Sequence, residues 1–206
     1  FKNLDGFTVV ENPGIELNWL TFNLHKDTPL QDVNVRKAIM YGINRQRIID
    51  MVYLGYAEPV YSFIYPEMDT FNENIEQYNY NPEKAKEILE DAGYTDTDGD
   101  GIRNDPETGE NLAFEASVQS YKTHLIKLMQ IIEETISEVG IKLEVTPMDQ
   151  DTLLEYIYAP TEDKYEISSI DEEPGPYADW VWEFARSYEN GGEGWNAAYY
   201  NSEEFD

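Results

Sequence analysis

The stretch Leu112–Val145 reads LAFEASVQSYKTHLIKLMQIIEETISEVGIKLEV, and its hydrophobic pattern changes twice. Apolar residues stand at 112, 114, 116 and 118, the alternation that is typical of a strand with one buried face. Over 125–139 they stand at 125, 128, 132, 136 and 139, which predicts an amphipathic helix. Gly140 is expected to end this helix, and the alternation returns over 141–145. The stretch therefore predicts a strand, a helix and a second strand.

The residues before this stretch predict one further strand and three helices. Ile15–Leu24 alternates, but its phase shifts once at Trp19 and Leu20, which predicts a strand with a bulge or a change of face. Asp32, and Asn81 followed by Pro82, are typical helix starts. The predicted helices are Val33–Ile43, Arg45–Leu54 and Asn81–Ala92. Two segments without a clear period separate these elements, Glu58–Asn79 and Thr95–Glu110.

The residues after the stretch continue the alternation of helices and strands. Either Asp149 or Asp151 is expected to cap a helix that runs through Tyr158. The further predicted elements are a strand at Tyr165–Ile170, a helix at Tyr177–Tyr188, a strand at Trp195–Tyr200 and a helix that begins within Asn201–Asp206. This order predicts an α/β or α+β layer fold, with helices packed on a mixed sheet. We expect residues 1–206 to form a single domain that contains the Asp- and Gly-rich loop 95–110, called the Asp loop below.

The composition limits the possible functions. The chain has 206 residues, of which 42 are acidic and 14 are Lys or Arg, so its formal charge is −28. Hydrophobic residues make up 41% and aromatic residues 14%, which predicts a folded chain and not an acidic disordered tail. A polyanion repels phosphate backbones and anionic lipid surfaces, so nucleic-acid binding is excluded as a function.

Cysteine content and the chain's start add three expectations. The absence of Cys excludes disulfides, cysteine-ligated zinc and thiol catalysis. There is no apolar run of the length that a transmembrane helix needs, about 20 residues. The first residue is Phe1 and no signal peptide precedes it, so we expect a mature segment or a fragment of a longer protein.

The Asp loop carries the strongest local motif. Acidic residues at positions 1, 3 and 5, Gly at 6 and Glu at 12 follow the spacing of a calcium-binding loop, whose ligands are hard oxygen atoms. An EF-hand has an apolar residue at position 8, where Arg103 stands here, so the loop is more similar to those of thrombospondin type-3 repeats. The alternative is a turn without an ion. The predicted ligands of a structural Ca²⁺ are Asp96, Asp98, Asp100, the carbonyl of Ile102, and Asp105 or Glu107.

Three segments together resemble one family. The first contains Phe22-Asn23-Leu24, Pro29-Leu30-Gln31-Asp32-Val33-Asn34-Val35-Arg36-Lys37-Ala38-Ile39 and Gly42-Ile43-Asn44-Arg45-Gln46-Arg47-Ile48-Ile49; the second is Tyr80-Asn81-Pro82-Glu83-Lys84-Ala85-Lys86-Glu87-Ile88-Leu89-Glu90-Asp91-Ala92-Gly93-Tyr94; the third is Ala198-Tyr199-Tyr200-Asn201-Ser202-Glu203-Glu204-Phe205-Asp206. These segments resemble the large solute-binding proteins of the oligopeptide, dipeptide and nickel type, which feed ABC importers. The resemblance runs from about residue 20 to the end, in the family's order.

The resemblance implies a fold and a mode of action. Members of the family are two-lobed clamps that close on a solute. This chain resembles the second lobe alone, so the first lobe and the ABC permease subunits are expected partners. The location implied is extracellular or periplasmic, with a membrane anchor in the full-length protein. An isolated lobe is expected to bind the free solute poorly, because half of the contacts are missing.

The resemblance also points to two loops as parts of a solute site. In peptide-binding relatives, an Asp in an acidic turn pairs with the solute's amino group. The matching position here is Glu172, with Asp171 adjacent to it. A second loop of the relatives can carry a basic group for the solute's carboxylate, and Lys122 and His124 are the candidates here. The basic residue that some relatives place on the strand before the turn is matched by Glu166, which has the wrong sign.

Aromatic residues near the C-terminus form a third candidate site. Tyr177, Trp180, Trp182 and Trp195 could form a stacking wall for a sugar or a side chain. The spacing of residues 177, 180 and 184 also fits a helical stripe in the core, and core packing is the alternative.

No pattern in the sequence favours an enzyme. The two histidines, His25 and His124, are far apart, and there is no nucleophile, metal triad or cofactor signature, so no catalytic residue and no required cofactor is expected. A binding component of an importer is the main interpretation, with peptides as the solute. An oligosaccharide-binding member of the same family is the alternative, as is a calcium-stabilised surface domain without a role in transport.

Overall fold

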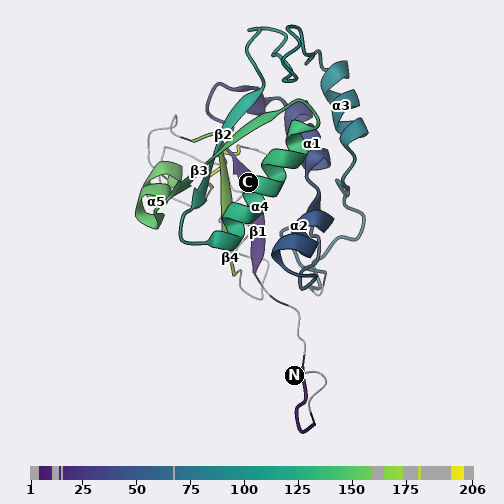
Figure 1. Ribbon diagram of the computed structural model, residues 1–206, viewed down its shortest axis with the longest axis vertical. Helices are drawn as coiled ribbons and strands as arrows, with labels where there is room; N and C mark the ends of the chain where they lie inside the picture. Colours follow the sequence, from purple (N-terminus) through teal and green to yellow (C-terminus); the bar gives the residue numbers. More distant parts are fainter. Residues whose placement is uncertain are drawn as a thin grey trace.

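The computed structural model describes residues 5–10, 14, 16–66, 68–158, 165–173, 181 and 196–201. Its centre is a four-stranded sheet in the order β1-β4-β2-β3 (Figure 1). The strands are β1 (Leu17–Phe22), β2 (Ala113–Gln119), β3 (Lys142–Met148) and β4 (Ile167–Glu172). β1 is antiparallel to β4, whereas β2 is parallel to both β3 and β4. The mixed sheet of the sequence analysis is confirmed.

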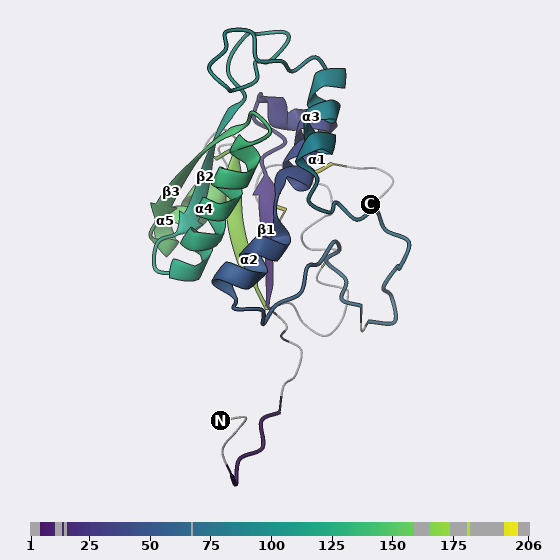
Figure 2. The same cartoon turned by 45° about the vertical axis from the view of Figure 1, so that its right-hand side comes forward.

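Helices cover one face of this sheet, and a further helix packs on their outer side. The helices are α1 (Val33–Gly42), α2 (Arg45–Val52), α3 (Pro82–Asp91), α4 (Thr123–Ser137) and α5 (Gln150–Tyr158), with a short 3-10 turn, η1, at Pro29–Gln31. α1, α2 and α4 lie on the same face, and α3 packs on the outer side of α1 (Figure 2). In the part of the chain that the structure describes, no helix is both long and apolar enough to cross a bilayer.

The segment 112–145 forms the predicted strand–helix–strand unit. Phe114, Ala116 and Val118 of β2 face α4, which buries one stripe against them. That stripe consists of Leu125, Leu128, Met129, Ile132 and Ile136. The connection from α4 to β3 passes through Gly140, whose φ is +85° and where an added Cβ would lie 2.8 Å from the side chain of Arg103. A glycine is therefore required at this turn for two reasons, its backbone conformation and the close approach.

The predicted helix caps are confirmed. The side chain of Asp32 accepts a hydrogen bond from the N–H of Asn34 at 2.8 Å, and Asn81 accepts one from Lys84 at 3.0 Å. Of the two candidate caps of α5, Asp149 is the one used, since its carboxylate accepts from the backbone N–H and the hydroxyl of Thr152. These bonds lower the pKa of the Asp149 carboxyl, with the Thr152 hydroxyl as the main cause.

Of the two alternatives predicted for the first strand, the bulge is not observed and the change of face is. β1 pairs with β4 without interruption, from Leu17 opposite Glu172 to Phe22 opposite Ile167. The phase of the apolar pattern shifts because both faces of β1 are covered. Phe22 packs on the main core beneath the helices, while Trp19, on the other face, contacts the ring of Phe63 at 5.4 Å between centroids.

The strand predicted at Trp195–Tyr200 is also not observed in its described part. Residues 196–200 form a turn in which the Asn196 side chain accepts from the N–H of Tyr200 at 3.1 Å and donates to its carbonyl at 2.7 Å. An Asn side chain that closes a turn on itself competes with strand pairing. The helices predicted at Tyr177–Tyr188 and within Asn201–Asp206 lie largely outside the described residues.

Candidate functional site

The candidate site lies where β2 and β4 end. These two strands are parallel, so their carboxyl ends meet at one edge of the sheet, which is where open α/β sheets bind ligands. The turn after β2 carries Lys122 and leads into α4, whose second residue is His124. Asp171 stands near the end of β4. The structure thus brings together three of the residues that the sequence predicts for solute binding.

Asp171 is the centre of this group. Its side chain is only 5% exposed, and its Oδ1 accepts a hydrogen bond from the Lys122 ammonium at 2.5 Å. Lys122 occupies the N-cap position of α4 but makes no side-chain capping bond, because an ammonium has no acceptor for a backbone N–H; its side chain instead donates to Asp171. A buried carboxylate with a charged partner is strongly held, since loss of either group would leave the other uncompensated.

His124 approaches the other oxygen of the same carboxylate. Its Nε2 lies 3.8 Å from Asp171 Oδ2, too far for a direct hydrogen bond but close enough for an ion pair when the ring is protonated. The edge of the His124 ring meets the ring of Tyr53, at the end of α2, with 6.3 Å between centroids. Burial raises the pKa of the Tyr53 hydroxyl to about 12, with smaller contributions from the charges of Glu16 and Asp171. Tyr53 is therefore neutral at physiological pH.

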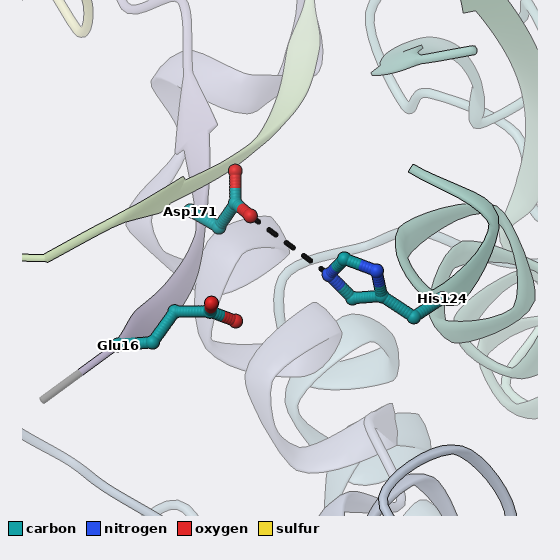
Figure 3. A group of neighbouring side chains, drawn as sticks. All are labelled: Glu16, His124 and Asp171. Atoms are coloured by element: carbon teal, nitrogen blue, oxygen red, sulfur yellow. Dashed lines mark ion pairs between the residues drawn. The ribbon is translucent and has the colours of Figure 1, made fainter. Parts of the chain in front are cut away.

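Glu16 completes the group from the residue before β1. Figure 3 shows its carboxylate beside that of Asp171, with both directed toward the His124 ring. One ligand atom from each of Glu16, His124 and Asp171 lies within 4.8 Å of the other two. The amide of Asn18 donates to Glu16 Oε1 at 3.3 Å. We call Glu16, Tyr53, Lys122, His124 and Asp171 the β4-end cluster.

Glu16 and Tyr53 are not among the site residues that the sequence predicts. The antiparallel register places Asn18 opposite Asp171, so Glu16, two residues before Asn18, lies on the same face of the sheet. Tyr53, at the end of α2, lies in the cluster because α2 packs on α4. Neither relation leaves a local pattern in the sequence, because both depend on which strands and helices become neighbours.

Several buried polar atoms of the cluster have no hydrogen-bond partner among the described residues. They are His124 Nε2, the Tyr53 hydroxyl and the neighbouring Asn18 Oδ1. Most buried polar atoms in folded proteins are paired, so an unpaired atom of this kind has a specific cause, such as a bound water or ion. The cluster therefore has both charge and free coordinating atoms.

Glu172 lies on the opposite face of the sheet. Successive residues of a strand point to opposite sides, so Glu172 is directed away from Asp171, Lys122 and His124. It is exposed. Burial raises the pKa of Tyr158 on α5 to about 12, and the charge of Glu172 adds a smaller contribution. Of the two acidic candidates, it is Asp171 that joins the basic ones, although the family's position matches Glu172. Tyr177 and Trp180 lie outside the described residues.

Glu166 is engaged elsewhere. Its Oε1 pairs with Lys26 at 3.1 Å, and its Oε2 accepts the backbone N–H of Glu115 at 2.7 Å. This carboxylate joins β2 to the chain before β4 and does not contribute to the cluster.

The Asp loop brings Asp96, Asp98 and Asp100 together, with one oxygen of each within 4.8 Å of the others. Both oxygens of Asp96 accept backbone N–H groups, from Gly99 at 2.7 Å and Gly101 at 3.0 Å. These bonds, chiefly that of Gly99, lower the pKa of the Asp96 carboxyl. The loop thus forms a series of carboxylate-closed turns.

The two outer candidates for a calcium ligand are not in this group. Asp105 instead closes a second turn, in which its Oδ1 accepts the N–H groups of Glu107 and Thr108 at 2.7 and 3.1 Å. The ligand-type atoms that lie together in the loop therefore belong to Asp96, Asp98 and Asp100, and neither Asp105 nor Glu107 is among them.

Arg103 explains why the loop departs from an EF-hand. Its side chain is buried and donates to the carbonyls of Val139 at 3.0 Å and Tyr94 at 2.7 Å, and to Glu90 at 2.9 Å. These acceptors lie at and beyond the C-terminal ends of α3 and α4. Arg103 therefore fixes the loop to both helices, where an EF-hand has an apolar residue.

The family follows from a comparison of the whole chain. Residues 1–201 match the family described as bacterial extracellular solute-binding proteins, family 5, middle part. The chain belongs to this family. Over 92 residues, or 45% of the chain, it is 40% identical to the dipeptide-binding protein of Escherichia coli K12, and this segment is 17% of that protein. The curated relatives are named as binding proteins, of a dipeptide and of glutathione.

Solved structures have the same fold. The oligopeptide-binding protein AppA of Bacillus subtilis, in complex with a nonapeptide, superposes with a TM-score of 0.84 at 21% identity, over 98% of this chain and 40% of AppA. An oligopeptide-binding protein of Thermotoga maritima, bound to mannohexaose, gives a TM-score of 0.73 at 23% identity, over 91% of this chain and 36% of that one. The chain thus spans less than half the length of these relatives.

Proposed function

We propose that this chain is part of the solute-binding component of an ABC importer and that the solute is a peptide. The observation that carries the proposal is the β4-end cluster, which lies at the carboxyl ends of parallel strands in a chain of family 5. The dipeptide-binding relative and the AppA complex with a nonapeptide favour peptides over other solutes.

The mechanism proposed is capture between two lobes. A first lobe, outside this chain, closes over the edge of the sheet, and the closed protein delivers the peptide to the permease subunits. The component acts outside the cytoplasmic membrane, held there by an anchor of the full-length protein. Closure removes water from the solute, which strengthens each charged contact that it makes.

Within this chain, Lys122 and His124 are proposed to bind the carboxylate of the peptide. Asp171 holds the Lys122 ammonium at 2.5 Å and orients it at the edge of the sheet. Lys122 remains 24% exposed and His124 39% exposed, whereas Asp171 is only 5% exposed. Both basic side chains are therefore partly exposed, although His124 Nε2 itself is buried, and the buried acidic side chain holds Lys122 in place.

A thermal-shift screen of the intact protein tests this proposal. Free dipeptides and tripeptides should raise the melting temperature by mass action, and the same peptides with an amidated C-terminus should do so less. The reason is that an amide removes the charge that Lys122 and His124 would bind. The absence of a shift with any peptide would overturn the proposal, and an equal shift with amidated peptides would overturn the assignment of Lys122 and His124.

An oligosaccharide is the second candidate solute. The observation that favours it is the similarity in fold to the Thermotoga protein, which was solved with bound mannohexaose. The same screen with mannohexaose separates the two solute classes. A rise in melting temperature with the sugar alone would replace peptides by oligosaccharides as the cargo.

A further inference from the structure

We propose that Glu16, His124 and Asp171 form a binding site for a first-row divalent transition-metal ion, such as Zn²⁺ or Co²⁺. The ion would be held by the side chains of this chain, and its binding does not depend on the capture of a solute. The three ligands come from the residue before β1, the first turn of α4 and the end of β4. An ion at this point would join three elements that are distant in sequence.

The donor set favours this class of ion. Imidazole nitrogen and carboxylate oxygen are common ligands of Zn²⁺. Imidazole is also a good ligand for nickel and copper. Calcium and magnesium prefer oxygen ligands throughout. The single nitrogen of His124 therefore distinguishes this site from the Asp loop, where the grouped ligands are all carboxylates.

The distances are close to those of a bound ion. Bonds of about 2.0–2.1 Å in a tetrahedral site place neighbouring donors about 3.3 Å apart. His124 Nε2 and Asp171 Oδ2 are 3.8 Å apart, so a small movement would bring both to bonding distance. The third ligand atom, from Glu16, is within 4.8 Å of both. Glu16 is exposed, so its flexible side chain can adjust without disturbing the core.

The surroundings hold the two carboxylates in position. Lys122 donates a hydrogen bond to Oδ1 of Asp171, and Oδ2 of the same carboxylate is directed toward His124. The amide of Asn18 donates to Glu16 Oε1, which leaves the other oxygen of Glu16 without this bond. Such outer contacts orient metal ligands and are part of most metal sites.

Two further observations point to a cation. His124 Nε2 is buried and has no hydrogen-bond partner among the described residues, although its carboxylate neighbour is near. With a neutral imidazole, the charges of Glu16, Asp171 and Lys122 sum to −1, and the chain as a whole carries −28. A divalent cation is therefore attracted to the site both locally and over a longer range.

Cobalt titration tests the proposal in the intact protein after treatment with a chelator and dialysis. Co²⁺ binding is followed by its visible absorption, and Zn²⁺ and Ca²⁺ are then added as competitors. The variant is His124→Gln, and the matched control is His25→Gln, an exposed histidine that contacts Tyr199 outside the cluster. Glu16→Gln changes an exposed ligand and serves as a second variant if His124→Gln does not fold.

The expected result is a site that the wild type and His25→Gln share and that His124→Gln and Glu16→Gln weaken at least about tenfold. Zn²⁺ should displace Co²⁺, and Ca²⁺ should not. The proposal is overturned if His124→Gln binds Co²⁺ as tightly as His25→Gln, or if Ca²⁺ competes as well as Zn²⁺. Because solute binding is measured separately in the presence of EDTA, failure of the metal site and failure of the proposed function are distinguishable.

Discussion

Two regions of this molecule each bring three metal-ligand side chains within 4.8 Å of one another, but they are built differently. In the Asp loop the three are Asp96, Asp98 and Asp100, which are alternate residues of one turn. In the β4-end cluster they are Glu16, His124 and Asp171, which come from three elements of the fold. The first group is obvious in the sequence, and the second becomes visible only in the structure.

The two regions also use their carboxylates differently. Both oxygens of Asp96 accept N–H groups of the loop itself, and Asp100 accepts the N–H of Ile102 and the amide of Asn111. In the cluster, Asp171 is buried, its Oδ2 faces His124, and His124 Nε2 has no hydrogen-bond partner among the described residues. The carboxylates of the loop thus close turns within one segment, whereas the charged groups of the cluster converge from distant elements.

Removal of Arg103 should have the largest effect, because it attaches the Asp loop to the body of the protein. Arg103→Met would leave the buried carbonyls of Val139 and Tyr94 without their donor. We expect a loss of about 3 kcal/mol in the free energy of unfolding, measured by urea denaturation. Lys86→Met is the control: it breaks an exposed ion pair with Glu83 and should cost at most about 0.5 kcal/mol. Equal stability of the two variants would contradict the structural role of Arg103.

Loss of the buried carboxylate in the cluster should have the next largest effect. Asp171→Asn removes the charge that pairs with Lys122, and we expect a loss of about 1–2 kcal/mol, reduced because Lys122 can reach solvent. Asp98→Asn in the loop should cost less than about 0.5 kcal/mol, since an Asn side chain closes the same turn. A larger loss of stability for Asp98→Asn than for Asp171→Asn in urea denaturation would contradict the claim that the carboxylate of the cluster contributes more than that of the loop.

Lowering the pH should have a smaller effect, which comes from Asp96 of the Asp loop. Hydrogen bonds from the loop backbone lower the pKa of Asp96, so its contribution to stability is present above its unfolded pKa, about 3.9, and is lost as the pH falls through its folded pKa. The melting temperature of the wild type should exceed that of Asp96→Asn at neutral pH. Melting curves from pH 7 to pH 2 should show this difference disappear at the acidic end, and a constant difference would contradict the mechanism.

Calcium should have the smallest effect on stability. Its use tests whether the Asp loop and the β4-end cluster are independent sites. We predict that Ca²⁺ at a few times its dissociation constant stabilises the Asp loop by on the order of 1 kcal/mol. In thermal melts, Asp98→Asn should weaken the response to Ca²⁺, because it removes one charge, and keep the response to Zn²⁺, and His124→Gln should do the opposite. A loss of both responses in one variant would show that the two regions are not independent sites.

The sequence predicts the local parts of this fold well and the contacts between distant parts poorly. The periodicity over 112–145 predicts β2, α4 and β3, and Asp32 and Asn81 predict the starts of two helices, because these signals lie within a few residues of each other. For β1 the sequence leaves a bulge and a change of face as alternatives, because it does not indicate that Phe63, from a segment without regular structure, covers the second face of this uninterrupted strand.

The site follows the same rule. Lys122, His124 and Asp171 were candidates because their loops resemble those of a family, but that resemblance matched the acidic position to Glu172. Strand alternation separates the two acids, and it is Asp171 that lies on the face of α4, beside Lys122. The position of Glu16 beside Asp171 depends on the register between β1 and β4. Their paired residues are about 150 positions apart in the chain, so no local pattern in the sequence indicates that Glu16 belongs to the site.

The most direct test of the account is a calorimetric titration of the intact protein with a dipeptide, in the presence of EDTA. Lys122→Met removes the basic group that Asp171 orients, and Lys127→Met removes an exposed lysine from the same helix, α4. We predict that Lys127→Met binds like the wild type and that Lys122→Met binds at least about tenfold more weakly, which corresponds to one charge-assisted contact. Equal affinity of the two folded variants would contradict the assignment of the β4-end cluster as the solute site.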